Sequence, residues 1–379
     1  MKVKLTMPRQ LKIGLMAGMM TLLISGVVYA AVNYYSSQES EAGSRTGNVA
    51  TIADVTASGS NAVKFGTGEQ TGDRCPARFP VPSCVGLPPG WTSTATYTTD
   101  RIVSGDNTTY QNFTMDGAVL YVTGENVTIR GVRFINGAGI STVRNDWCAV
   151  NTVIEDSYFS GSGADWLASG LDATIEEGGF TARRVFMDGV YEALRVGGRN
   201  LDNWACGNVA IEKSYIRVTY PPKCMTTPGW DWHGDGLQFY DGQYSSVTDS
   251  VILMDGASGV SECFGTAPYF LADQCNTGRT GSPPWTTIEC TTFQPWYNNT
   301  LAAHNGVIAD VNGLIVAGGS YPFRTYMATR VQDLYVKNND WVYGPIDADC
   351  SHVTAGWEAN LATIDGNGQP VASAAIACQ

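Results

Sequence analysis

The chain has 379 residues and carries 23 Lys and Arg side chains against 35 Asp and Glu, a formal net charge of −12 at pH 7. This length is enough for one large domain with an N-terminal extension, and the 43 glycines suit a chain that turns many times. Because an acidic surface repels phosphate backbones, the composition argues against nucleic acid as a partner.

The N-terminus has the pattern of a segment that directs a chain to the membrane. Four basic residues precede an uncharged apolar run over residues 13–32: Lys2, Lys4, Arg9 and Lys12. The run approaches the roughly 20 residues that span a bilayer, which favours a retained anchor, whereas Val28 and Ala30 suit a cleaved signal peptide. Residues 1–35 are predicted to be one or the other, and the remainder is predicted to be extracellular or on the cell surface.

Residues 36–72 are rich in Ser, Gly, Ala and Thr and have no sustained apolar period. We expect a flexible linker here, in which Val63–Phe65 could form a first strand, and a folded domain over residues 73–379. Without the leader the chain has 19 basic residues against 35 acidic ones, a net charge of −16. Such a surface repels a free polyuronate unless a cation bridges the two, whereas a neutral glycan meets no such barrier.

All ten cysteines follow the export segment, and their even number in an exported chain favours disulfides. Cys75 and Cys84 are close enough in the chain to close a short loop, while the remaining pairing cannot be deduced. No CxxC pair occurs, and only His233, His304 and His352 could add nitrogen ligands, so the spacing does not indicate zinc.

A short strand-like phrase recurs about seven times between Glu125 and Gly344, as in NVTIRGVRFING from Asn126 and NVAIEKSYIRV from Asn208. Steps of 25, 27, 30 and 36 residues separate five aligned positions, which are Phe134, Phe159, Phe186, Ile216 and Ile252. The phrases alternate apolar and polar residues, end in Gly, Asn or Asp turns, and show no helical period. This pattern predicts an all-β solenoid of stacked coils.

The coil period over residues 75–379, together with WHGDGLQFYDG from Trp232, resembles the right-handed parallel β-helix of the pectate-lyase-like superfamily. The phrase is similar to HxDGxQ-type segments in such proteins. The resemblance implies the fold, but that superfamily includes lyases, glycoside hydrolases, epimerases and non-catalytic surface proteins, so it does not select an activity.

A second phrase in each coil has the order small, apolar, polar, as in Ala193-Leu194-Arg195 and Gly236-Leu237-Gln238. If the apolar residue points inward, the next residue points outward, because side chains alternate across a strand. The predicted external ladder is Ser141, Asp172, Arg195, Gln238, Ser261 and Arg324. Neighbouring coils are about 4.8 Å apart, so a chain of sugars could lie along several of them.

The candidate site residues lie on these strands or just before them. Candidates for catalysis are Asp235, His233, Glu192, Arg195 and Arg324, and candidates for substrate binding are Asp172, Gln238, Trp232 and Tyr321. Together they offer the groups that protonate, deprotonate or orient a glycan. The structural alternative stays open for each, because Asp and Asn stack as turn ladders in solenoids and an exposed ion pair contributes little.

An insertion is predicted to interrupt the coils over residues 262–300. It holds three cysteines and several aromatic residues, among which Trp285 and Trp296 are candidates for the wall of a saccharide cleft. The alternative is a small satellite core beneath the loop.

Two reactions on a polysaccharide fit these residues. In β-elimination, which the resemblance implies, Arg195 or Arg324 acts beside Ca²⁺ held by Asp172, Glu192 and Asp235. In hydrolysis, two carboxylates drawn from the same three residues flank the glycosidic bond. The chain lacks both the Asp-rich and Arg-Pro motifs of the best-known pectate lyases and the Asp-Asp and Gly-His-Gly motifs of polygalacturonases.

The alternative to an enzyme is a tethered β-helix that binds glycan or projects from the surface as an adhesin. In either case we expect a monomer that touches the membrane only through residues 1–35.

Overall fold

The computed structural model describes residues 49–53, 61–65, 74–144, 147–197, 206–227, 232–240, 244–256, 263, 265–271, 297–348, 350 and 353–378. The chain divides into two units, Met1–Gly72 and Asp73–Gln379. The predicted export segment lies outside the described residues. Within them, no helix is long and apolar enough to cross a membrane.

In the first unit, β1 (Val49–Ala53) and β2 (Asn61–Phe65) pair in antiparallel fashion. Both strands fall within the stretch predicted to be a linker, and β2 contains the predicted strand Val63–Phe65.

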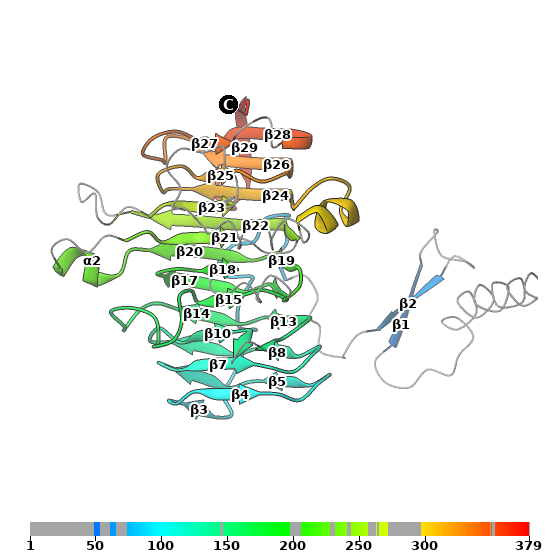
Figure 1. Ribbon diagram of the computed structural model, residues 1–379, viewed down its shortest axis with the longest axis vertical. Coiled ribbons are helices and arrows are strands. Elements are labelled where there is room, and N and C mark those ends of the chain that lie inside the picture. The colour runs from blue at the N-terminus through cyan, green and yellow to red at the C-terminus, as the bar shows by residue number, and fades with distance from the viewer. Residues whose placement is uncertain are drawn as a thin grey trace, which may run out of the picture. The chain divides into compact units, whose positions relative to one another are not determined.

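The second unit is mostly β and is built from parallel strands stacked coil upon coil (Figure 1). Nine of its strands form one sheet, which we call the A sheet. They are β4 (Arg101–Val103), β7 (Val119–Val122), β10 (Gly139–Ser141), β15 (Ile175–Glu177), β18 (Leu194–Val196), β21 (Asp235–Phe239), β23 (Ala267–Leu271), β25 (Phe323–Thr325) and β27 (Ile346–Ala348).

The remaining strands of the stack form a sheet of 16 strands, the B sheet, which has two halves. The first half holds β5 (Thr109–Gln111), β8 (Thr128–Arg130), β13 (Thr152–Glu155), β16 (Phe180–Arg183) and β19 (Val209–Glu212). The second holds β3 (Thr96–Tyr97), β6 (Thr114–Asp116), β9 (Arg133–Ile135), β14 (Tyr158–Ser160), β17 (Phe186–Val190) and β20 (Tyr215–Thr219).

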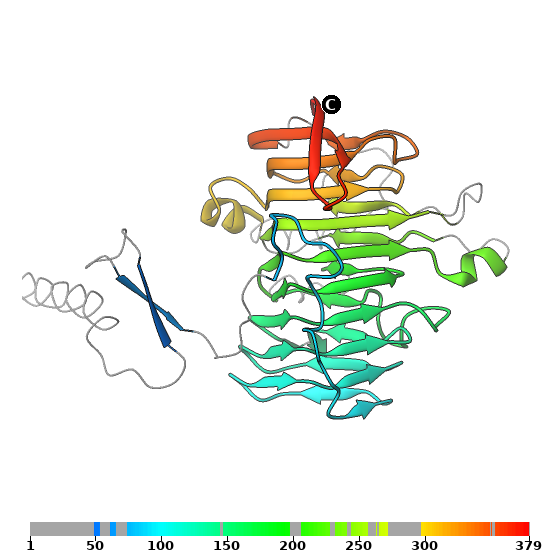
Figure 2. The same ribbon diagram turned by 180° about the vertical axis from the view of Figure 1, so that it is seen from behind.

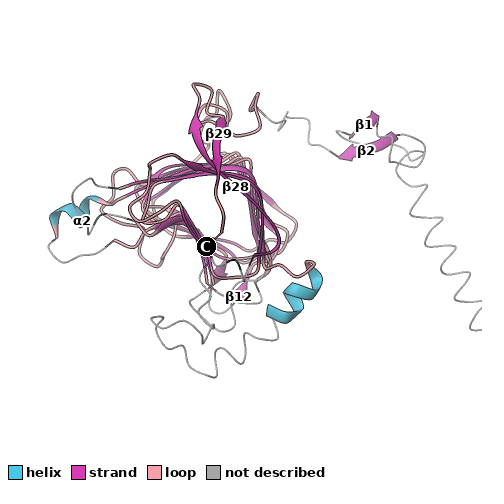
Figure 3. Ribbon diagram, turned by 90° about the horizontal axis from the view of Figure 1, so that it is seen from above, coloured by secondary structure: helices cyan, strands magenta, loops and turns pink. Residues whose placement is uncertain are grey.

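Long strands join the two halves of the B sheet. They are β22 (Ser245–Asp255), β24 (Ala309–Ala317), β26 (Thr329–Lys337) and β28 (Val353–Ile364), and β29 (Pro370–Ala375) returns antiparallel to β28. Each coil therefore contributes one stretch to each half and one strand to the A sheet. Seen from above, the coils superimpose around a common core (Figure 3), an arrangement consistent with a parallel β-helix. The prediction of stacked β coils is confirmed.

The core follows from the alternation of inward apolar side chains along each strand. In the A sheet, Leu120, Ile140, Ile175, Leu194 and Leu237 stack in register and are buried. Aromatic rings stack in the same way, as for Phe134 and Phe159, whose centroids lie 4.4 Å apart. Such identical neighbours bury apolar area in every coil.

The predicted alignment fails at Phe186, because Phe159 pairs with Met187. Met187 points into the core, whereas Phe186 packs on the outside near Tyr158 and Tyr215. A shift of the alignment by one residue moves a side chain to the opposite face of the strand. Val185, Phe186 and Met187 are all apolar, so the sequence does not show which of them faces the core.

A ladder of asparagines supports the turns that precede the first half of the B sheet. Asn107, Asn126 and Asn151 have φ values of 54°, 55° and 57°. The Asn126 Nδ2 donates to Asn107 Oδ1 (3.1 Å), and the Asn151 Nδ2 donates to Asn126 Oδ1 (3.0 Å). Asparagine tolerates this left-handed conformation and its side chain bonds the next copy in the stack.

We expect Asn126→Ala to lower the free energy of unfolding by about 1–2 kcal/mol, because it removes two amide hydrogen bonds and places Cβ-bearing alanine at positive φ. Chemical denaturation measures the change. Asn126→Gly, which accepts the backbone conformation, should cost clearly less, and equal losses in the two variants would contradict the conformational part of the argument.

Residues 74–94, which we call the strap, run along the corner between the two halves of the B sheet; the strap is the cyan segment crossing the coils in Figure 2. Corner residues adopt positive φ, and the strap donates to their carbonyl oxygens. The Thr94 N–H donates to Asn112 O (2.7 Å), Trp91 Nε1 to Gly131 O (2.6 Å) and the Gly86 N–H to Arg184 O (2.9 Å). The strap thus satisfies polar groups that the coils leave open.

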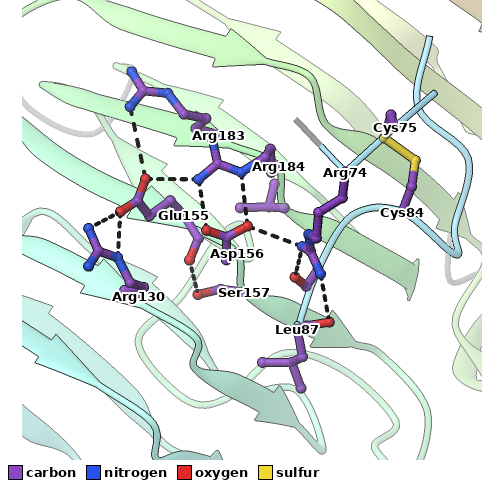
Figure 4. Close-up of polar contacts among 12 residues, drawn as sticks. Arg74, Cys75, Cys84, Leu87, Arg130, Glu155, Asp156, Ser157, Arg183 and Arg184 are labelled. Carbon is purple, nitrogen blue, oxygen red and sulfur yellow. Dashed lines mark hydrogen bonds and ion pairs between the residues drawn. A yellow bond between two sulfur atoms is a disulfide. The ribbon is translucent and has the colours of Figure 1, made fainter. Parts of the chain in front are cut away.

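The strap is fixed at several points (Figure 4). The predicted disulfide Cys75–Cys84 is confirmed and closes a loop within it. Arg78 bonds Asp249 and Asp333, and Gln369 in the β28–β29 turn exchanges two hydrogen bonds with the backbone of Phe79 (3.1 and 2.9 Å).

Three further disulfides are Cys148–Cys206, Cys224–Cys263 and Cys350–Cys378, whereas Cys275 and Cys290 lie outside the described residues. Cys224 lies in the short helix α2 (Pro222–Thr226).

The insertion predicted over residues 262–300 starts too early in the chain, because β23 (Ala267–Leu271) is a regular strand of the A sheet within that range. The sequence Ala-Pro-Tyr-Phe-Leu does not predict a strand, because proline is uncommon within strands.

Candidate functional site

The outward ladder of the A sheet exists, but one of its predicted members, Asp172, is wrong. The strand register aligns Tyr121, Ser141, Glu176, Arg195, Gln238, Phe270, Arg324 and Asp347. Glu176 takes the place predicted for Asp172, and Phe270 takes the place predicted for Ser261, which lies outside the described residues. We call this row of residues the A ladder.

The misassignment of Asp172 has a structural cause. Leu171 packs on Val119 and Leu167 in a small cluster apart from the main core, so Gly170-Leu171-Asp172 belongs to a loop that covers the sheet. The true strand begins three residues later at Ile175. Gly-Leu-Asp and Thr-Ile-Glu both have the order small, apolar, polar, and local sequence cannot distinguish them.

Glu192 and Asp235 lie in neighbouring coils just before the inward residues Leu194 and Leu237. The side chain of Asp235 is fully buried, and that of Glu192 nearly so. The Asp235 N–H donates to Glu192 Oε2 (3.0 Å), and the Ala267 N–H donates to Asp235 Oδ1 (2.9 Å). Each carboxyl group therefore accepts a backbone hydrogen bond from the next coil.

Burial raises the pKa of both carboxyl groups well above their ordinary range. For Glu192 the negative charge of Asp235 raises the pKa further, while the backbone N–H of Asp235 and the charge of Arg195 lower it. For Asp235 the hydrogen bond from Ala267 and the charges of Arg324 and Arg195 only partly offset burial. Two carboxyl groups this close favour the retention of at least one proton.

Arg195 joins this pair to the surface. Its guanidinium lies 3.4 Å from Asp172 Oδ2 and 5.1 Å from the centre of the Tyr240 ring. Asp172, with a side chain 42% exposed, is the most open carboxylate near the pair, and its charge contributes to the raised pKa of Glu192. The cluster of Asp172, Glu192, Arg195 and Asp235, which we call the acidic cluster, therefore spans from the core to solvent.

Three buried polar atoms in the acidic cluster have no hydrogen-bond partner within the part of the chain that the structure describes. They are Glu192 Oε1, Arg195 Nε and Asp235 Oδ2. Unpaired buried polar atoms are costly and uncommon, so three from adjacent coils mark a place where a water, a proton or a ligand group is expected.

Arg324 lies further along the A ladder among aromatic rings. Its guanidinium lies 3.1 Å from Asp347 Oδ2 and 2.7 Å from the Tyr326 hydroxyl, and 4.7 Å from the centre of the Phe270 ring. Tyr326 also donates to Asp347. Tyr321, a predicted binding residue, lies with its ring centre 5.6 Å from the same guanidinium.

Other predicted site residues have different surroundings. Trp232 is 1% exposed and its Nε1 donates to Tyr191 O (2.8 Å), so it packs in the core and presents no ring to a substrate. His233 is exposed two residues before β21, whereas Gln238 lies on the A ladder but is buried, with 8% of its surface exposed. Trp285 and Trp296 lie outside the described residues.

Sequence reasoning missed Glu176, Tyr240, Phe270, Tyr326 and Asp347. Phe270 and Asp347 could have been found only by locating β23 and β27, which are strands of five and three residues.

A preformed calcium site is not seen. Within the described residues, no three or more His, Cys, Asp or Glu side chains are arranged to hold a metal ion. Of the three carboxylates predicted to do so, Glu192 and Asp235 each have one oxygen that accepts a backbone hydrogen bond, and Asp172 pairs with Arg195.

Comparison with models of known families, with curated proteins and with solved structures gives no significant match to this chain.

Proposed function

We propose that this chain is an exported, right-handed parallel β-helix, related to the pectate-lyase-like superfamily, that binds a polysaccharide along the A ladder and hydrolyses it at the acidic cluster. The observation that carries the proposal is the set of three unpartnered buried atoms, Glu192 Oε1, Arg195 Nε and Asp235 Oδ2, beside carboxyl groups of raised pKa. Perturbed carboxyl groups with unsatisfied atoms are typical of catalytic sites.

The A ladder suits an extended glycan. From Arg195 to Arg324 it crosses four neighbouring strands, a span of about 14 Å, along which Arg195, Phe270 and Arg324 are partly exposed and Gln238 is buried. Aromatic rings and a few polar groups are the usual lining of ligand sites. Because Arg195 is paired with Asp172 and Arg324 with Asp347, the ladder has little excess positive charge and favours a neutral polysaccharide.

Hydrolysis is the reaction that the carboxyl groups support. The oxygen of a water molecule bonds to the anomeric carbon, one carboxyl group gives its proton to the leaving oxygen, and a second carboxylate takes a proton from the water. The Glu192–Asp235 pair, whose raised pKa retains a proton, supplies the acid. Asp172, the exposed member, supplies the second carboxylate. Elimination is the weaker alternative, because its cation lacks a preformed ligand set among the described residues.

Export is supported by the disulfides, which persist in oxidising compartments. We propose that the protein acts as a monomer outside the cell or at its surface.

The test is an activity screen of the full chain on neutral and uronate polysaccharides, with and without Ca²⁺. New reducing ends without ultraviolet absorbance are expected, and a Ca²⁺-dependent rise in absorbance would instead establish elimination. Arg195→Met should lower kcat/KM at least about tenfold, since it removes the charged group between the pair and the surface. Arg133→Met, an exposed change in β9, is the matched control and should be silent.

A non-catalytic glycan-binding β-helix is the second candidate. It is favoured by the complete burial of Asp235 and by the backbone hydrogen bonds that both carboxyl groups accept, which suit a purely structural role. Binding of a polysaccharide that is weakened by Arg324→Met, without any product from any substrate, would support this candidate over the enzyme.

A further inference from the structure

A cavity of about 420 Å³ lies on the outside of the B sheet, on different strands from the A ladder. It is formed where β16, β19 and β22 begin, together with the residue that follows helix 297–303. The lining residues that face a ligand here include Asn151, Asn208, Ala210, Tyr244, Ser246 and His304. The volume falls within the range of small-molecule sites.

The floor of this cavity is made of small side chains in register. Thr181 pairs with Ala210, and Ala210 pairs with Ser246, in three successive strands. Adjacent outward positions of the same sheet carry larger charged groups, such as Asp310 and Arg330. The step from small to large side chains creates the hollow.

One wall is a pair of stacked rings. The Tyr244 and His304 rings lie 3.8 Å apart and are nearly parallel, at 4°. A hydrogen bond between the Tyr244 hydroxyl and Asp310 orients the phenol, and Asp310 is held in turn by Arg330 (2.8 Å). The wall is therefore preorganised by residues outside the cavity, which limits the side-chain entropy that the protein would lose on binding a ligand.

The described lining is uncharged near neutral pH. It has no Asp, Glu, Lys or Arg side chain. Burial lowers the pKa of His304, which keeps its imidazole neutral, and burial and Asp310 raise the pKa of Tyr244 to about 12, which keeps its phenol protonated. In a chain of net charge −12 this cavity is therefore an uncharged site lined by hydroxyl and amide groups.

We propose that this cavity, the Tyr244 pocket, binds a neutral saccharide unit and is a carbohydrate site separate from the A ladder. A sugar ring presents apolar C–H faces and a rim of hydroxyls. Those features match an aromatic wall, a floor of small side chains, and the exposed amides of Asn151 and Asn208 at the rim. A charged ligand would find no counter-ion among the described lining residues and would have to shed its hydration.

The experiment is a calorimetric titration of the full chain with neutral gluco-, xylo- and manno-oligosaccharides, with uronate oligosaccharides as comparators. Ala210→Trp fills the floor, and we expect it to weaken the association constant for a neutral oligosaccharide at least tenfold. His304→Ala, which removes one of the two stacked rings of the wall, should weaken the same binding several-fold. Ala372→Trp on the exposed strand β29 is the control and should have no effect.

The results also separate this site from the proposed activity. Arg195→Met should leave binding at the Tyr244 pocket intact, and Ala210→Trp should leave hydrolysis of short substrates intact. Circular dichroism verifies folding of each variant, and His304→Ala decides the matter if Ala210→Trp does not fold. The proposal is overturned if neither variant changes binding, if only uronates bind, or if no oligosaccharide binds at millimolar concentration.

Discussion

Replacing Arg184 with methionine should lower the free energy of unfolding by about 3 kcal/mol. The Arg184 guanidinium is almost completely buried and lies 3.1 Å from Glu155 Oε2 and 2.7 Å from Asp156 Oδ2, carboxylates whose side chains are each 7% exposed (Figure 4). Without Arg184, Glu155 retains Arg130 and Asp156 retains Arg74, which is why the expected loss is at the lower end for a broken buried pair. Methionine preserves the packing of the stem, and urea denaturation measures the difference.

The neighbouring residue provides the control. Arg183 pairs with Glu212 at 2.6 Å, where both side chains are more than a third exposed, and lies 3.9 Å from Glu155 Oε2, at the outer limit of an ion pair. Solvent screens such a pair, so Arg183→Met should cost less than about 1 kcal/mol. If the two variants lose the same stability, the buried network is not what holds the strap to the corner.

The second large effect is expected for Asp235→Asn, which should reduce hydrolysis at least about 100-fold and yet leave the protein as stable as the wild type, or more stable, at pH 8. Asparagine keeps an oxygen to accept the Ala267 N–H, but it cannot exchange a proton with Glu192. Activity on the polysaccharide found by the screen and urea denaturation of the same preparations give the two readouts.

The free energy of unfolding should also depend on pH through the raised pKa values of this carboxyl pair. Burial raises the pKa of Glu192 and Asp235, so the folded chain binds protons more tightly than the unfolded chain does. The stabilisation by these protons is complete below the unfolded carboxyl pKa of about 4 and is lost as pH rises through the raised folded pKa values. The wild type should therefore lose stability over this interval, and Asp235→Asn should lose less.

Asp235→Ala is the companion variant, because it leaves the Ala267 N–H without its acceptor and should cost about 1–3 kcal/mol at both ends of the pH range. Equal losses for the asparagine and alanine variants at pH 8, with activity retained in the former, would identify Asp235 as a structural residue alone.

The sequence predicts the coils well because every coil has buried apolar residues at equivalent positions. Phe134 with Phe159 and Leu194 with Leu237 align as expected, since alternation and turn residues specify them locally. The disulfide Cys75–Cys84 was predictable from its short loop, whereas pairs 39 or 58 residues apart depend on which coils stack.

The candidate site was less predictable, because loop lengths decide which residues meet. Asp172 and Glu176 both fit the local pattern, and only the stacking of β10, β15 and β18 places Glu176 on the A ladder. Burial of Trp232 likewise depends on its contact with Tyr191, which lies 41 residues earlier in the chain. A single sequence carries no periodic signal for such contacts.

The strap reverses the usual relation between the order of synthesis and the order of assembly. Arg78 and Phe79 are among the first residues of the second unit to leave the ribosome, yet their partners Asp333 and Gln369 lie 255 and 290 positions later. Neighbouring coils can associate as they emerge, because their contacts are local along the chain. The strap can complete its contacts only when the last coils exist, so a segment made before every coil is fully fixed only after all of them.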